Sequence, residues 1–146
     1  MKYFPAGSME AESYEGQRDL DDLVSYINSK AGTFRASDGS LLPIAGRILA
    51  IDDLIAGANF AVTTDLVEKI KTAAAVAEDK SSANAYISAA EKVVSKGANY
   101  VFQESARLKK MIESGSVKPA SRTSFQLKQN ILRAFMPSQE TDKSEL

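Results

Sequence analysis

Two residue types that often carry catalytic chemistry, cysteine and histidine, are absent from this sequence of 146 residues. Their absence excludes thiol chemistry, zinc sites with nitrogen or sulfur ligands, and any catalytic triad built on imidazole. We therefore expect the chain to have no thiol oxidoreductase activity and to bind no metal and no cofactor.

Two pairs of neighbouring aspartates are the obvious candidates for acid–base chemistry. They are Asp21 with Asp22 and Asp52 with Asp53. If each pair lies on a helix, its side chains diverge by about 100° and are poorly placed to share one site. We interpret both pairs as solvating or capping groups.

Charged side chains also gather between positions 104 and 118. Glu104 and Arg107 are spaced for an ion pair within one helix, and Lys109, Lys110 and Lys118 extend the basic group. A solvated helix face accounts for this pattern better than a binding site does.

The aromatic residues at positions 100 and 102 are the best candidates for a contact with a partner. Tyr100, Val101 and Phe102 are three consecutive bulky residues that follow Gly97. At about 100° per residue they cannot all face one core, so at least one should be exposed. Tyr100 and Phe102 are therefore candidate peptide-binding residues, although a core role is the commoner one for such rings.

Composition sets further limits on the partners. The chain has 18 basic and 19 acidic residues and a net charge of −1, which gives no overall field to attract nucleic acid or an anionic lipid surface. No apolar run approaches the roughly 20 residues of a membrane span. A hydrophobic fraction of 44% is typical of a globular protein with one ordinary domain, or with a small domain and a fragment of another. We expect neither a nucleic-acid nor a membrane partner.

The elements that must position these residues centre on residues 83–114. Apolar side chains recur there mostly at steps of three and four, which predicts a helical hairpin or one long bent helix. Gly97 is the expected break, because a residue without Cβ adopts a left-handed cap or a kink at least cost, and the helix should resume near Asn99. The stripes expected to face the core are Tyr86, Ala90, Val93, Val94, Val101, Leu108, Met111 and Ile112.

Neighbouring amphipathic segments should cover this hairpin. A short helix is predicted within residues 44–58, and a second should begin at Thr63 or Thr64 and end before residues 80–82. A last helix should start at Ser121 or Thr123 and end at Pro137. The inward residues of these three are Ile44, Ile48, Ile51, Leu54, Ile55, then Leu66, Val67, Ile70, Ala74, Val76, then Phe125, Leu127, Ile131, Leu132 and Phe135.

The first 32 residues have a different pattern. Residues 2–4 and 10–14 predict the two strands of a hairpin joined by a Pro-Ala-Gly-Ser turn. Asp19 is the expected N-cap of a helix whose apolar stripe, Leu20, Leu23, Val24 and Ile27, ends before Ala31 and Gly32. A hairpin and one helix are too small to close a core, so most of this apolar face should lack cover.

These first residues carry a family resemblance. The runs KYFPAGS at residues 2–8, YEG at 14–16 and RDLDDLVSYIN at 18–28 resemble the last hairpin and helix of a thioredoxin domain of protein disulfide isomerases. The earlier strands of that domain, its Cys-x-x-Cys helix and its cis-proline loop have no counterpart here. Dithiol exchange needs a thiolate as the nucleophile. Because this chain has no cysteine, it should not carry out the exchange that a parent isomerase performs.

The helical part resembles the all-helical D domain that follows the thioredoxin domains in one class of these isomerases. The resemblance covers residues 41–135 and rests on Ile44, Ala45, Gly46, Arg47, Leu54, Tyr86, Lys96, Gly97, Tyr100, Glu104, Arg107, Leu108, Asn130, Ile131, Leu132 and Phe135. It implies a mainly α fold in which a five-helix bundle follows a β-hairpin and one helix of a partial thioredoxin unit.

The expected organisation has four parts. Residues 1–32 form the C-terminal piece of a thioredoxin-like domain, residues 33–43 a polar and protease-sensitive linker, residues 44–136 the helical bundle, and residues 137–146 a disordered tail. The tail ends in Lys143, Ser144, Glu145 and Leu146, which resemble the K-D-E-L retrieval signal. Ser144 replaces the usual acidic residue, which could weaken retrieval.

Two functions from different classes follow. The first is a non-catalytic interaction or chaperone module of a folding factor in the endoplasmic-reticulum lumen. Its partners would be unfolded or nascent proteins, held weakly, and the retrieval receptor. The second is a cytosolic helical adaptor or assembly domain. Enzyme activity of a parent isomerase stays uncertain from this chain, and homo-oligomerisation stays open.

Overall fold

The computed structural model describes residues 1–137, which fall into two compact units. The first is Met1–Ala45 and the second begins at Gly46. Within residues 1–137 the structure is mainly helical, with one two-stranded hairpin, as the sequence predicts. None of these helices is long and apolar enough to cross a membrane.

The first unit contains the predicted hairpin and helix. Strands β1 (Lys2–Tyr3) and β2 (Glu12–Ser13) pair antiparallel, with Lys2 opposite Ser13. The second strand is shorter than the residues 10–14 expected. Helix α1 (Leu20–Ala31) is capped at its start by Asp19, whose side chain accepts a hydrogen bond from the Asp22 amide, and at its end by a left-handed Gly32.

Aromatic contacts join this helix to the hairpin. The Tyr26 ring of α1 lies 4.6 Å from the ring of Tyr14 and 6.0 Å from that of Tyr3, between centroids. An ion pair of 2.5 Å between Lys30 and Glu12 adds a polar link. No residue of α1 is buried, so most of the apolar face of this unit lacks cover, as its size predicts.

Residues 33–43, expected to be a linker, hydrogen-bond to α1. The Asn28 side chain donates to the Arg35 carbonyl at 2.8 Å and accepts from the Arg35 amide at 3.0 Å. The Ser37 hydroxyl donates to the Asp21 carboxylate. The protease sensitivity of this segment stays a prediction.

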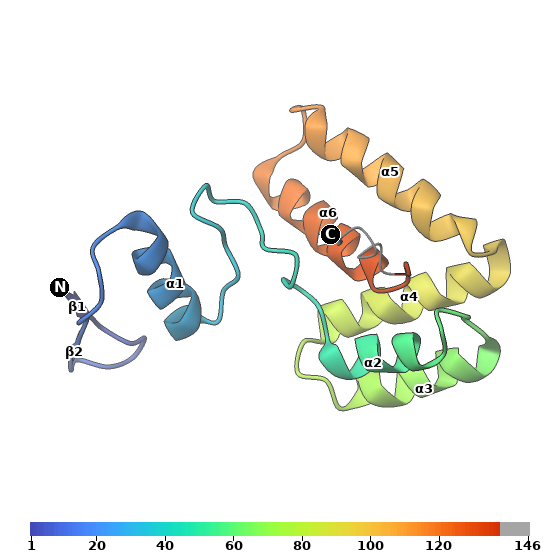
Figure 1. The fold of residues 1–146 in the computed structure, drawn as a ribbon, viewed down its shortest axis with the longest axis horizontal. Helices are drawn as coiled ribbons and strands as arrows, with labels where there is room; N and C mark the ends of the chain where they lie inside the picture. Colours follow the sequence, from blue (N-terminus) through green and yellow to red (C-terminus); the bar gives the residue numbers. More distant parts are fainter. Residues whose placement is uncertain (138–146) are drawn as a thin grey trace, which may run out of the picture. The chain divides into compact units, whose positions relative to one another are not determined.

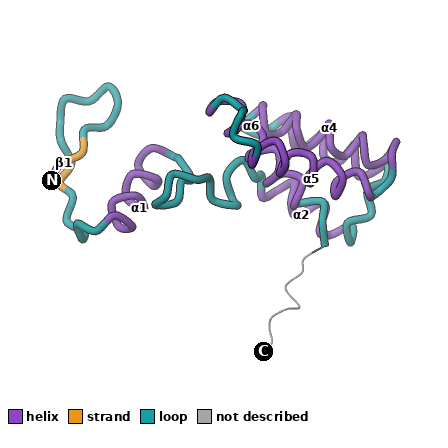
Figure 2. Tube along the Cα trace, turned by 90° about the horizontal axis from the view of Figure 1, so that it is seen from above, coloured by secondary structure: helices purple, strands orange, loops and turns teal. Residues whose placement is uncertain are grey.

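Five helices form the second unit, in the order predicted. They are α2 (Leu49–Gly57), α3 (Thr64–Ala75), α4 (Lys80–Lys96), α5 (Asn99–Glu113) and α6 (Pro119–Arg133). Helix α4 is central, since it packs against α3, α5 and α6, while α2 packs on α3 (Figure 1). Figure 2 shows the helices of this unit from above, in purple.

The break at Gly97 and the restart at Asn99 are confirmed. Gly97 has a φ of 95°, which few side-chain-bearing residues adopt, and its amide closes α4 on the Val93 carbonyl. The core around this hairpin contains fully buried side chains from each of the five helices of the second unit, the largest being Tyr86, Ile51, Ile55, Ile70, Leu108, Ile131 and Leu132.

Two helix starts were predicted too late. Helix α4 begins at Lys80 rather than after residue 82, because the Asp79 side chain caps it by accepting from the Ser82 amide. Helix α6 begins at Pro119 rather than at Ser121 or Thr123, because proline fits the first position of a helix, where its missing N–H is not needed.

Three residues expected to face the core are exposed. Val76 is 84% exposed because it follows the last turn of α3, and Ile44 is 59% exposed because it precedes α2. Val94, 44% exposed, lies one residue after the buried Val93 and therefore faces outward.

Candidate functional site

The aromatic residues after the Gly97 bend differ in their environments. Tyr100 is only 8% exposed, and its ring lies 5.7 Å from the Lys92 ammonium and 5.9 Å from that of Lys96. Phe102 is 49% exposed, while Val101 between them is buried. The prediction that at least one of the three is exposed is therefore confirmed for Phe102, whereas Tyr100 is buried.

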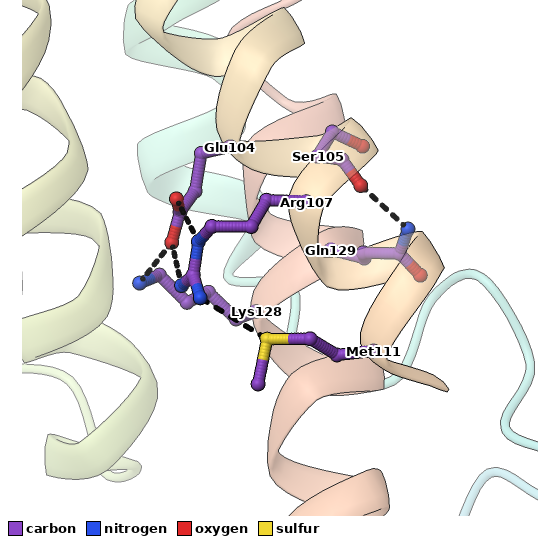
Figure 3. A network of polar contacts seen from close by, with 6 residues as sticks. All are labelled: Glu104, Ser105, Arg107, Met111, Lys128 and Gln129. Atoms are coloured by element: carbon purple, nitrogen blue, oxygen red, sulfur yellow. Dashed lines mark hydrogen bonds and ion pairs between the residues drawn. The ribbon is translucent and has the colours of Figure 1, made fainter. Parts of the chain in front are cut away.

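A polar network on the same helix joins α5 to α6 (Figure 3). The Glu104 carboxylate accepts from Arg107 Nε at 2.8 Å and from a second guanidinium nitrogen at 2.7 Å. It also accepts from the Lys128 ammonium of α6 at 2.9 Å. The Gln129 side chain donates to the Ser105 carbonyl at 3.2 Å, which adds a second link between these helices.

These donors stabilise the charged form of Glu104. Hydrogen bonds from Arg107 are the largest influence, and with Lys128 they lower the pKa of Glu104 to about 2, although partial burial opposes the shift. The Glu104–Arg107 pair predicted from spacing is therefore present. Its additional partner Lys128 comes from another helix, which spacing cannot reveal.

The remaining basic residues of this region stay at the surface. Lys109, Lys110 and Lys118 are exposed, in agreement with a solvated face. They are separate from the network, whose cation from α6 is Lys128.

Asp52 is half-buried and Asp53 is exposed, and Asp52 is not a solvating group. Its carboxylate accepts from the hydroxyl of fully buried Tyr86 at 2.5 Å and from Arg47 Nε at 3.0 Å. The Tyr86 hydroxyl accepts in turn from the Ile48 amide at 3.0 Å. Burial is the main cause of a raised pKa of the Tyr86 phenol, and the bond to Asp52 adds to it.

Arg47 extends this network to α6. Its guanidinium donates to the Asn130 carbonyl at 3.2 Å, so the segment before α2 is tied to α4 and α6 at once. Spacing along the sequence does not reveal this link. The available signal was a tyrosine at a core position, since a buried tyrosine hydroxyl usually finds a partner.

A hollow of about 420 Å³ lies beside Asp52, bounded by residues near α2 and at the C-terminal end of α6. Arginine, aspartate and apolar side chains line it: Arg47, Leu49, Asp52, Asp53, Ala56, Phe60, Arg133, Ala134 and Met136. This hollow was not predicted from the sequence, because its walls come from segments more than 70 residues apart.

The backbone at one wall of the hollow is strained. Asn59 has a φ of 55° and Phe60 a φ of 62°, so two consecutive residues with side chains adopt the left-handed region. For a bulky residue such as phenylalanine this conformation is a genuine outlier that costs on the order of 1–3 kcal/mol. The Phe60 amide bonds to the Ile55 carbonyl at 3.0 Å, and the ring packs partly against the core, so the turn is held in place.

The residues of the predicted retrieval signal cannot be placed. Lys143, Ser144, Glu145 and Leu146 lie outside the described residues 1–137.

Comparison with curated proteins finds relatives named as protein disulfide isomerases. Protein disulfide-isomerase tigA of Aspergillus niger is 37% identical over 146 residues, covering 100% of this chain and 39% of the relative. Protein disulfide-isomerase erp38 of Neurospora crassa is 38% identical over 152 residues, covering 100% of this chain and 41% of the relative. Protein disulfide isomerase-like 2-2 of Oryza sativa is 35% identical over 143 residues, covering 92% and 38%.

The chain therefore spans about two fifths of the length of these relatives. No solved structure matches it. One protein family matches residues 46–135, that is, helices α2 to α6, and it is described as endoplasmic reticulum protein ERp29, C-terminal domain. By this match over the helical bundle the chain belongs to the ERp29 C-terminal domain family, and its fold is the D domain of a protein disulfide isomerase preceded by part of a thioredoxin unit.

Proposed function

We propose that this chain is a non-catalytic interaction module of a folding factor of the protein disulfide isomerase family, and that it holds unfolded polypeptide weakly through Phe102. The proposal is supported by the family of the helical bundle and by the names of its relatives. The carrying observation is the side chain of Phe102, which is 49% exposed next to the buried Val101.

The strength of such a contact suits transient binding. Covering a phenylalanine ring contributes on the order of 1.5–3 kcal/mol before the cost of ordering the peptide. A single contact of this size gives low selectivity, which is what a protein needs if its clients share only exposed apolar side chains.

The proposed location is the lumen of the endoplasmic reticulum. The description of the matching family names an endoplasmic-reticulum protein, and the last four residues of the chain resemble a retrieval signal. A secreted reporter that carries residues 138–146 at its C-terminus should be retained more than one that lacks Leu146. Equal secretion of both reporters would remove the retrieval receptor from the list of partners.

The test of client binding compares two exposed phenylalanines. Phe102→Ser should reduce photo-crosslinking of the chain to an unfolded protein by roughly three- to tenfold, since about 1.4 kcal/mol corresponds to a factor of ten. Phe34 is 45% exposed on the first unit, so Phe34→Ser is a matched control that should change crosslinking little. Helical circular dichroism should be the same for both variants.

The opposite result has a definite meaning. If Phe102→Ser crosslinks as well as the unchanged chain while the fold is intact, Phe102 is not the client contact. Positioning of the redox domains in a longer parent protein would then be the better account of the bundle.

A further inference from the structure

Charged side chains line the hollow between α2 and the end of α6, and they take no part in the proposed client contact at Phe102. Of its two arginines, Arg47 is paired with Asp52 at 3.0 Å. Arg133 donates to the Asn130 side chain at 3.0 Å but forms no ion pair within residues 1–137. Asp53 is exposed and likewise forms no ion pair in that part of the chain. One cation and one anion on its walls are therefore available to a ligand.

Apolar side chains make up another part of the same walls. Leu49 is 73% exposed at the first turn of α2, and Phe60 and Met136 are half-buried. Phe60 is held here by the left-handed turn described above, in a conformation that a bulky residue rarely adopts. Strain of this kind is more frequent at ligand sites than elsewhere in proteins. A volume of about 420 Å³ is within the usual range for a site that takes a small group or a few side chains.

We infer that this hollow binds an extended peptide segment in which one apolar side chain lies between an acidic and a basic residue. The apolar side chain would contact Leu49, Phe60 and Met136. The acidic residue would pair with Arg133 and the basic residue with Asp53, so that neither wall charge is left without a partner when water is displaced.

The charges decide between this ligand and simpler ones. A purely acidic segment would be attracted by Arg133 but repelled by Asp53. A purely basic segment would be attracted by Asp53 but repelled by Arg133. An uncharged apolar segment would take water from both groups without replacing its hydrogen bonds. The site therefore favours mixed charge, which distinguishes it from the contact at Phe102, where the exposed group is a single ring.

The experiment uses the full chain and four fluorescently labelled peptides with blocked ends. One has glutamate, phenylalanine and lysine in this order, each separated by glycine. The others replace the glutamate by glutamine, the lysine by glutamine, or the phenylalanine by serine. We expect each replacement to weaken binding, measured by fluorescence anisotropy, by about three- to tenfold.

Two charge-removing variants assign the contacts. Arg133→Gln should weaken binding of the first peptide about three- to tenfold but leave binding of the peptide without glutamate unchanged. Asp53→Asn should likewise weaken binding of the first peptide but leave binding of the peptide without lysine unchanged. Lys110→Gln is the matched control, because Lys110 is an exposed cation of α5 outside the hollow. Leu49→Ser removes an apolar side chain that is 73% exposed, so it should weaken all peptides except the serine one without loss of the fold.

Several outcomes would overturn the inference. They are a first peptide that binds no better than the versions that lack its glutamate or its lysine, equal effects of Arg133→Gln and Lys110→Gln, and Leu49→Ser binding like the unchanged chain. The result is separate from that of the proposed function. Phe102→Ser should reduce general client crosslinking and leave the affinity for the first peptide within about twofold.

Discussion

The carboxylate of Glu104 receives three N–H donors, two from its own helix and one from α6. Its side chain is 12% exposed, while Arg107 and Lys128 are 55% and 38% exposed. Water around the exposed cations therefore screens these ion pairs. Their contribution to the free energy of unfolding is smaller than the value that corresponds to the full pKa shift of Glu104.

Glu104 should make the stability of the bundle depend on pH. Its pKa is about 2 in the folded chain and 4.5 ordinarily. The contribution is fully present above pH 4.5 and is lost as pH falls from there toward 2. Glu104→Gln should lower the free energy of unfolding by about 1–2 kcal/mol at neutral pH.

Denaturant titrations at several pH values would measure this. The gap between the unchanged chain and Glu104→Gln should close as pH falls through the same range. Glu113→Gln, at an exposed carboxylate at the end of the same helix, should show little gap at any pH. A gap for Glu104→Gln that is as large at pH 3 as at pH 7 would contradict the assignment.

Single residues also show what the sequence alone can and cannot predict. The exposure of one residue among 100–102 follows from helix geometry, and the Glu104–Arg107 pair follows from spacing. The contacts of Asp52 with Tyr86 and of Glu104 with Lys128 connect different helices, 34 and 24 positions apart. Nothing in local sequence ranks these partners above other polar residues of the right kind.

At the scale of elements, the glycines before and at the end of α2 differ in what a side chain there would meet. Gly46 has a φ of 78° before α2, and a Cβ there would lie 3.0 Å from Leu127 Cδ2. Gly57, at the end of α2, has no atom within 4 Å of that position and no left-handed φ. A side chain at position 46 therefore meets both an unfavourable backbone conformation and a close neighbour. A side chain at position 57 meets neither, so it reports only the general effect of replacing glycine.

Replacing these glycines by alanine should have opposite effects. Gly46→Ala should destabilise the bundle by about 1–2 kcal/mol, from the left-handed conformation and the contact with Leu127. Gly57→Ala should stabilise it by about 0.5 kcal/mol, because alanine has less freedom to lose on folding. Urea denaturation followed by circular dichroism measures both. Equal effects of the two changes would show that the turn at Gly46 tolerates a side chain.

The elements themselves were largely predictable. Periodicity placed all five bundle helices in order, and Gly97 marked the break between α4 and α5. The errors lie at helix starts, where one capping contact from Asp79 or one proline at position 119 decides the first turn. The hollow beside α2 was beyond prediction, because it depends on how the helix ends are packed together.

At the scale of the whole molecule, the two units differ in how much core they contain. The buried apolar cluster consists of residues from Ile51 to Phe135, all in the second unit. In the first unit α1 has no buried residue, and Phe4, Leu20 and Ile27 are 60%, 60% and 49% exposed. The size of a core decides whether a unit folds alone, so the two should behave differently when they are separated.

We expect a fragment of residues 44–146 to fold without the rest of the chain. It retains the whole buried cluster and the network of Arg47, Asp52 and Tyr86. Its thermal transition should stay cooperative, with a midpoint within about 4 °C of that of the full chain, which corresponds to a change of less than about 1 kcal/mol.

A fragment of residues 1–43 should melt without a sharp transition, because its aromatic contacts among Tyr3, Tyr14 and Tyr26 form at a surface rather than in a core. Circular dichroism of each fragment, and of the two mixed in equal amounts, checks this. If residues 44–146 lose their helical signal alone and regain it on mixing, the bundle depends on the first unit and the two do not fold independently.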